Sequence, residues 1–85
     1  MNGYEIRITK QAEKDIDKLT PKLRKKLKTI LTEVIAQRPY EGKKLLGELV
    51  GNYSYRLSYQ DRIIYSVDKE SRIIYVKRAR THYGE

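Results

Sequence analysis

The last third of the chain, Tyr53–Glu85, most constrains the fold, because its apolar and polar residues alternate. Alternation at every second position is typical of a β-strand with one buried face and one exposed face. The segment therefore predicts three short strands joined by tight connections. The apolar faces of the first two strands carry Tyr53, Tyr55 and Leu57, and then Ile63, Tyr65 and Val67.

The loop between these two strands decides which side chains share a face. Directly paired residues of an antiparallel hairpin point to the same face, and a slip of one residue turns a strand over. A three-residue loop, 59–61, gathers the apolar residues on one face, whereas a two-residue loop at 60–61 mixes apolar and polar residues. We therefore predict the three-residue loop, which also brings Arg56 and Arg62 together on the polar face. The predicted pairs are Ser58 with Arg62, Leu57 with Ile63, and Tyr55 with Tyr65.

The first half of the chain predicts one strand and two helices. Residues 4–8 alternate, and Thr9 suits the N-cap of a first helix because its hydroxyl can accept from the free amides of the first turn. Thr20 and Pro21 begin a second helix, since proline at the first helical position loses no hydrogen bond. Through residues 23–35 the apolar side chains then keep one face at the helical period.

The opposite face of the second predicted helix is strongly basic. Cations near a helix N-terminus oppose the macrodipole and repel one another. We interpret the face either as a ridge that contacts phosphates or as a solvated helix surface. Its members are Lys22, Arg24, Lys25, Lys26 and Lys28.

Together these elements give the order β-α-α-β-β-β, with the second helix ended by Arg38-Pro39. The order predicts the α+β class, in which a helical hairpin packs on one face of a mostly antiparallel sheet. At this length we expect residues 1–85 to form one domain.

Composition narrows the possible functions. The formal net charge of +8 favours a polyanionic partner, either nucleic acid or an acidic protein segment. The chain has no cysteine and one histidine, so we expect no bound metal and no cofactor. No apolar run approaches the roughly 20 residues of a membrane span, and the first residues lack the apolar stretch of a signal peptide. We therefore expect a cytoplasmic protein with no membrane partner.

Four short segments follow one another in a characteristic order: AEKDIDKL (12–19), RPYEGKKL (38–45), LVGNYSYRL (49–57) and DRIIY (61–65). In this order they resemble the RelE/ParE superfamily of bacterial and archaeal type II toxins, over essentially the whole chain. The superfamily holds two activities. RelE-like members, including the YoeB branch, are ribosome-dependent ribonucleases that cut messenger RNA, whereas ParE-like members act on DNA gyrase. The ending Arg80-Thr81-His82-Tyr83 is similar to the His-Tyr ending of the YoeB branch, which favours the ribonuclease.

This resemblance implies an endoribonuclease site that uses no metal. The 2′-hydroxyl of the substrate attacks the neighbouring phosphorus, which requires a base, cations for the charge on the phosphorane, and an acid for the departing 5′-oxygen. By resemblance, Arg56 and Arg62 match arginines of the two central strands, His82 acts as the acid, and Tyr83 positions the substrate. Arginine suits phosphate oxygens, and histidine transfers protons near neutral pH. Further substrate contacts are expected from Lys43, Lys44, Arg78 and Arg80.

The general base has several candidates. The YoeB branch has a glutamate in the loop before the sheet, where this chain has Lys43 or Lys44, and Glu41 lies two residues out of register. Three groups are able to take the proton: a lysine with a lowered pKa, Glu41, or His82 itself.

The resemblance also implies partners. These are a cognate antitoxin, acidic and partly disordered, that folds as it binds, and a ribosome carrying messenger RNA. Operator DNA is expected to bind only to the toxin–antitoxin complex.

Alternative interpretations stay open at this point. The chain could be a ParE-like gyrase inhibitor without catalysis, or a basic nucleic-acid-binding module without toxicity. Arg56 and Arg62 could also be structural residues, paired across the sheet with Glu48, Asp61 or Asp68.

Overall fold

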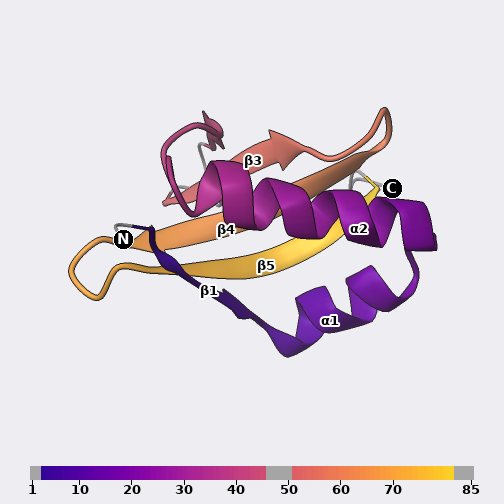
Figure 1. Cartoon of the computed structure of the whole chain (residues 1–85), viewed down its shortest axis with the longest axis horizontal. Helices are drawn as coiled ribbons and strands as arrows, with labels where there is room; N and C mark the ends of the chain where they lie inside the picture. Colours follow the sequence, from indigo (N-terminus) through magenta and orange to yellow (C-terminus); the bar gives the residue numbers. More distant parts are fainter. Residues whose placement is uncertain (1–2, 46–50, 82–85) are drawn as a thin grey trace.

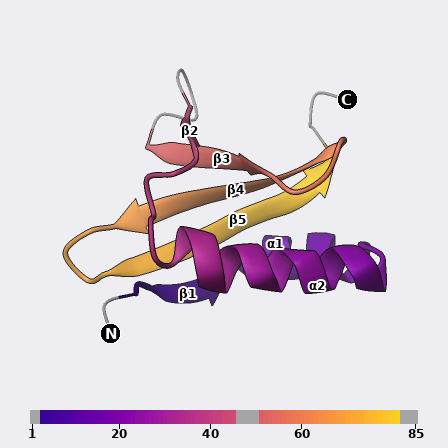
Figure 2. The same ribbon diagram turned by 45° about the horizontal axis from the view of Figure 1, so that its top comes forward.

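Two helices cover one face of a five-stranded sheet in the described residues, 3–45 and 51–81, of the computed structural model (Figure 1). The strand order is β1-β5-β4-β3-β2, with β1 parallel to β5 and the other neighbours antiparallel. Both helices lie on the same side of the sheet, which the turned view makes plain (Figure 2). The elements are β1 (Glu5–Ile8), α1 (Lys10–Asp17), α2 (Pro21–Ile30), β2 (Lys43–Lys44), β3 (Asn52–Arg56), β4 (Asp61–Asp68) and β5 (Ile73–Thr81).

This architecture confirms the predicted α+β class, with β3, β4 and β5 as the three strands of the last third. Two features were not predicted. The two-residue strand β2 adds to the edge of β3. The second helix keeps its α form only to Ile30 and continues as a π-helical turn, Leu31–Ile35, in which the N–H of Ala36 donates to the carbonyl of Leu31 at 2.8 Å. The wider turn leaves both Ile35 and Ala36 buried.

Both predicted helix caps are confirmed. The Thr9 hydroxyl accepts from the N–H of Ala12 at 3.2 Å, and the Thr20 hydroxyl accepts from the N–H of Leu23 at the same distance. Thr9 also donates through its hydroxyl to the carbonyl of Val76 at 3.0 Å. The first cap therefore fastens the start of α1 to β5 as well as closing the helix.

The hairpin of β3 and β4 corrects the predicted register by two residues. The connecting loop closes one residue earlier in the chain than predicted, because the N–H groups of Leu57 and Ser58 donate to the Asp61 carbonyl at 2.9 and 3.1 Å and so bring Leu57 opposite Asp61. The Ser58 hydroxyl in turn accepts from the N–H of Asp61 at 3.0 Å. Moving the loop by one residue shifts the partner of every residue of β4 by two residues along β3.

The corrected register changes the pairs but keeps the faces. The predicted pairs of Ser58 with Arg62, Leu57 with Ile63 and Tyr55 with Tyr65 are wrong. The observed pairs are Arg56 with Arg62, Tyr55 with Ile63 and Tyr53 with Tyr65. Because side chains alternate with a period of two, a shift of two residues leaves every side chain on its predicted face. The grouping of Arg56 and Arg62 on one face is confirmed.

A β-bulge in β5 brings Val76 and Ala79, which are three residues apart, to the same face of the sheet. Consecutive residues of β4 pair with Val76 and Arg78, so Lys77 is the extra residue of the bulge. As a result, Val76 and Ala79 both face the helices and are fully buried. The same shift places Arg78 and Arg80 on the opposite face of the sheet.

Tyr65 fastens the loop that follows the π-helical turn to the sheet. Its side chain is fully buried, and its hydroxyl donates to the carbonyl of Pro39 at 2.9 Å and accepts from the N–H of Gly42 at 3.1 Å. A Cβ at Gly42 would lie 2.5 Å from this hydroxyl, so the close approach requires glycine. Burial raises the pKa of Tyr65 to about 12, although the hydrogen bond from Gly42 acts against the rise. This contact fixes where β2 meets β3.

We expect Tyr65→Phe to lower the free energy of unfolding by about 1–3 kcal/mol at pH 7, because it leaves a buried carbonyl and an N–H without their partner. Urea unfolding measures the loss. The folded pKa is raised, so the contribution is full below the ordinary tyrosine pKa of about 10 and is lost as the pH rises towards about 12. Tyr59→Phe removes a hydroxyl from a side chain that is 89% exposed, and is the control expected to leave stability unchanged. Equal stabilities of wild type and Tyr65→Phe would contradict this account.

Candidate functional site

The face of the sheet opposite the helices carries most of the predicted site residues. We call it the open face, and it follows from the register because paired residues point the same way. The apolar residues Ile63, Tyr65 and Ala79 define the helix side. The described members of the open face around the predicted site are Lys43, Ser54, Arg56, Arg62, Ile64, Arg78 and Arg80.

Three arginines form a row across the open face. Arg56 of β3 is directly opposite Arg62 of β4, which is directly opposite Arg80 of β5. Side chains in such positions start about 5 Å apart at their Cβ atoms, and like charges directly opposite one another destabilise a sheet. We call Arg56, Arg62 and Arg80 the arginine row. An electrostatic cost of this kind is relieved when an anion binds between the guanidinium groups.

The two arginines nearest the β3–β4 loop have no acidic partner among the described residues. Arg56 donates to the carbonyl of Tyr59 at 3.5 Å, and Arg62 forms no ion pair within residues 3–45 and 51–81. Two of the carboxylates considered as structural partners bind elsewhere: Asp61 accepts from the Ser58 hydroxyl at 2.9 Å, and Asp68 accepts from the N–H of Ser71 at 3.2 Å. The third, Glu48, lies outside the described residues.

A hollow of about 440 Å³ opens beside these two arginines. Arg56 and Arg62 form one part of its lining, and Tyr59 and Gln60 of the connecting loop form the other. The hollow therefore combines two cationic groups, an aromatic ring and a side-chain amide.

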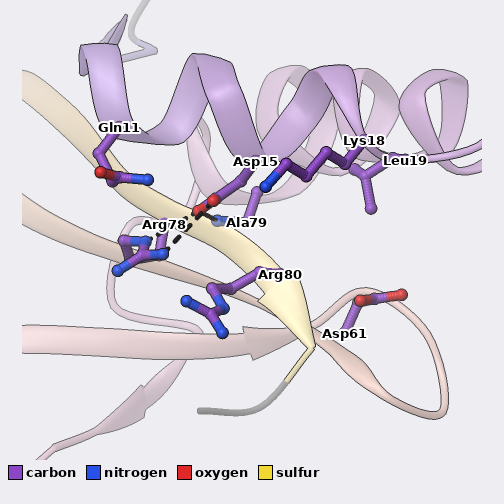
Figure 3. Close-up of a pocket in the computed structure, with 8 residues that line it drawn as sticks. All are labelled: Gln11, Asp15, Lys18, Leu19, Asp61, Arg78, Ala79 and Arg80. Carbon is purple, nitrogen blue, oxygen red and sulfur yellow. Dashed lines mark hydrogen bonds and ion pairs between the residues drawn. The ribbon is translucent and has the colours of Figure 1, made fainter.

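Arg78 is fixed by a carboxylate from the first helix. Asp15 of α1 accepts from Nε of Arg78 at 2.8 Å and from the N–H of Ala79 at 3.1 Å. Figure 3 shows the Asp15 carboxylate pointing from α1 towards both residues, with Arg80 further along the same strand. A second hollow, of about 350 Å³, is lined by Gln11, Asp15, Lys18, Leu19, Asp61, Arg78, Ala79 and Arg80.

The environment of Asp15 favours its charged form. Burial alone would raise the pKa of Asp15, but hydrogen bonds from Arg78 and Ala79, together with the charge of Arg78, lower that pKa below its ordinary value. The same carboxylate raises the pKa of Arg78. Because the guanidinium group of Arg78 is held by Asp15, it is less available to a phosphate than the groups of Arg56 and Arg62 are.

The candidate bases lie in different places. Lys43 pairs with Ser54 and is exposed on the open face, whereas Lys44 pairs with Tyr53 and points to the other side of the sheet. Glu41 is exposed in the preceding loop and forms an ion pair with Arg38 at 3.4 Å. Of these three candidates, the register brings Lys43 to the face that carries the arginine row.

The predicted residues His82 and Tyr83 lie outside the described residues. They follow directly on Thr81, which pairs with Asp61 at the end of β5. Their proposed roles stay predictions.

Sequence reasoning missed the role of Asp15 and the alignment of the arginines. Asp15 had a detectable signal, because it lies beside Ala12 and Ile16 on the apolar face of the first helix. A carboxylate on a buried face predicts a cationic or N–H partner. The alignment of the arginines had no such signal, because it depends on the residue at which the β3–β4 loop closes, which the hydrogen bonds to Asp61 decide.

Two negative findings apply to the described part of the chain. No three side chains of His, Cys, Asp or Glu lie close enough to hold a metal ion in residues 3–45 and 51–81. None of the helices found there is long and apolar enough to cross a membrane.

Solved toxin structures share this fold. A chain of the RelBE2 toxin–antitoxin complex of Mycobacterium tuberculosis is 28% identical, with a TM-score of 0.87 and coverage of 96% of this chain and 94% of that one. A chain of the YoeB–YefM complex of Staphylococcus aureus is 28% identical, with a TM-score of 0.77 and coverage of 94% and 98%. The isolated RelE toxin of E. coli is 28% identical, with a TM-score of 0.77 and coverage of 96% and 87%. Fold and sequence thus place the chain in the RelE/ParE superfamily of toxins.

Within that class the family is defined by sequence. A model of the ParE toxin of type II toxin–antitoxin systems matches residues 6–82. The chain belongs to this family. A search of curated proteins gave no match.

We expect Asp15→Asn to lower the free energy of unfolding by about 1–3 kcal/mol at pH 7, because it removes charge-assisted hydrogen bonds to Arg78 and Ala79. The folded pKa of Asp15 is lowered, so its contribution is present above the ordinary aspartate pKa of about 3.9 and is lost as the pH falls through the folded value. The difference from wild type should therefore shrink below pH of about 4 in denaturant unfolding. Asp17→Asn, at an exposed position of the same helix, is the matched control. A difference that does not depend on pH would contradict the ionic role.

Proposed function

We propose that this chain is a toxin that cuts messenger RNA on the ribosome, without a metal, through attack of the 2′-hydroxyl. The observation that supports the proposal is the arginine row: two of its members, Arg56 and Arg62, are directly opposite and have no acidic partner among the described residues. A row of like charges across a sheet does not stabilise the fold, and it matches the charge of a scissile phosphate.

In the proposed reaction the 2′-oxygen bonds to phosphorus as its proton leaves to a base. The bond from phosphorus to the 5′-oxygen breaks, and that oxygen takes a proton from an acid. The products are a 2′,3′-cyclic phosphate and a 5′-hydroxyl end. Arg56 and Arg62 donate to the phosphate oxygens, where negative charge increases in the transition state.

The proton transfers are assigned to residues around the row. His82 is assigned as the acid, since histidine, with an ordinary pKa of about 6.5, suits proton transfer near neutral pH. Tyr83 positions the substrate. Lys43 is the base candidate that shares the open face, and Glu41 and Lys44 are the rival candidates. Arg80 and Arg78 line the end of the same face.

The proposed partners follow from the family and from charge. The cognate antitoxin is an acidic, partly disordered chain that folds on the toxin. RelBE2 and YoeB–YefM, which share the fold, were crystallised as toxin–antitoxin complexes. Ribosome binding rests on contacts between basic side chains and RNA phosphates, so it weakens as salt rises. Operator DNA binds only to the toxin–antitoxin complex, and the protein acts in the cytoplasm.

A second candidate function is inhibition of DNA gyrase without catalysis. The matched family model favours it, because that model describes ParE toxins. Under this alternative the arginine row binds an anionic surface of its target and performs no chemistry.

We expect Arg62→Ala and Arg56→Ala each to slow cleavage of messenger RNA on programmed ribosomes by roughly 10²–10³-fold, the usual effect of removing one donor to a developing oxyanion. His82→Ala should also lose cleavage. Arg24→Ala removes an exposed arginine of α2 and should leave the rate unchanged.

The free energy of unfolding distinguishes a role of Arg62 in cleavage from a purely structural role. Because Arg56 and Arg62 repel each other, Arg62→Ala should keep the free energy of unfolding within about 0.5 kcal/mol of wild type. Parallel loss of stability and cleavage would make Arg62 a structural residue. A folded wild type that cuts no messenger RNA but blocks gyrase supercoiling would move the protein to the second function.

A further inference from the structure

The most exposed large aromatic side chain of the described residues lies beside the arginine row. Tyr59 is 89% exposed, at the tip of the loop that joins β3 to β4. Tyr40, the other exposed tyrosine of this part of the chain, is 51% exposed and contacts the ring of Tyr53 with centroids 5.6 Å apart. No aromatic contact of this kind involves Tyr59 in residues 3–45 and 51–81. Its ring is therefore open to a ligand on both faces.

The loop that carries Tyr59 is held without using the tyrosine ring. The Ser58 hydroxyl accepts from the N–H of Gln60 at 3.3 Å and from that of Asp61 at 3.0 Å, and it donates to the Asp61 carboxylate at 2.9 Å. Leu57, at the start of the loop, is fully buried in the core. The tyrosine is thus presented on a fixed backbone, which reduces the ordering that a ligand must impose.

The neighbours of Tyr59 make its surroundings specific. Tyr59 lines the hollow of about 440 Å³ together with Gln60, Arg56 and Arg62. The Tyr59 carbonyl accepts from Arg56 at 3.5 Å, which joins the loop to the start of the arginine row. An aromatic plane and a side-chain amide therefore lie next to two guanidinium groups within one hollow.

This combination matches the parts of one nucleotide in a single-stranded RNA. Unpaired bases stack on aromatic side chains, amides bind base edges, and arginines bind the phosphate. A duplex does not offer a free base face for stacking. The chemistry of the hollow therefore favours an unstacked nucleotide over a helical nucleic acid.

We propose that Tyr59 stacks on an unpaired RNA base whose phosphate is bound by Arg56 and Arg62, with the Gln60 amide at the edge of that base. This inference deepens the proposed function and rests on its choice of RNA as the substrate. It assigns Tyr59 and Gln60 to base binding, separate from the proton transfers at the arginine row.

The direct test uses tryptophan fluorescence, because the chain contains no tryptophan. Tyr59→Trp introduces one at the proposed site, and Tyr40→Trp introduces one at the other exposed tyrosine as the matched control. The probe is a single-stranded pentanucleotide RNA with 2′-O-methyl groups, which cannot be cut by 2′-hydroxyl attack. A second probe of the same charge has abasic positions. We expect quenching only for Tyr59→Trp and only with the probe that has bases.

Affinity gives a second measurement on the same probes. Tyr59→Ala should weaken binding of the base-containing probe by roughly 5- to 150-fold and leave binding of the abasic probe unchanged. Tyr59→Phe keeps the ring and should bind as wild type does. Arg62→Ala should weaken binding of both probes, because both carry phosphates.

The outcomes separate this inference from the proposed function, since the binding measurement needs neither cleavage nor ribosomes. Quenching of the Tyr59→Trp fluorescence, with no messenger RNA cleavage by wild type, supports the base site and contradicts the ribonuclease function. Cleavage without quenching overturns the base site and leaves the ribonuclease in place. Absence of probe binding by the folded wild type also overturns the base site, as does equal quenching by the abasic probe.

Discussion

The hydrogen bonds between Ser58 and Asp61 set the register on which the proposed site depends. Through the loop that they close, Arg56 is opposite Arg62. The β4–β5 pairing then adds Arg80 to the same line. A hairpin with the predicted loop, one residue later in the chain, keeps these side chains on the same face but offsets them along the strands. The short polar turn therefore decides whether the cations surround one phosphate, and it also fixes the exposed position of Tyr59.

Contacts at the two edges of the sheet hold Arg78 and Lys43 in place. β1 covers only the first half of β5, and α1 continues along the other half, where Asp15 accepts from the N–H of Ala79. Asp15 thus closes part of an exposed strand edge and holds Arg78 at the same time. At the other edge of the sheet, Tyr65 fixes the loop before β2 and so places Lys43 beside β3. The helices occupy one side of the sheet, and Arg56 and Arg62 on the other side stay available to an anionic ligand.

Much of the fold could be predicted because it depends on local chemistry. Hydroxyl caps at Thr9 and Thr20, the helical period and the alternation of the strands each predict an element directly, and all are present. The failures involve contacts between segments. The register depends on side-chain bonds inside one loop, the π-helical turn depends on packing, and the bulge at Lys77 depends on two strands together. The predicted face of Arg56 and Arg62 is correct because a register shift of two residues leaves each side chain on the same face. That the two arginines are directly opposite each other could be seen only in the structure.

The proposed function depends on binding of an RNA phosphate by the arginine row. NMR of the arginine Nε–Hε groups tests it most directly, during titration with a 2′-O-methyl dinucleotide that carries a single phosphate. We expect the signals of Arg56 and Arg62 to shift together and saturably, while the signal of Arg24 on α2 does not shift. Shifts confined to Arg24, with Arg56 and Arg62 unchanged, would exclude phosphate binding by the arginine row and assign anion binding to the basic helix face instead.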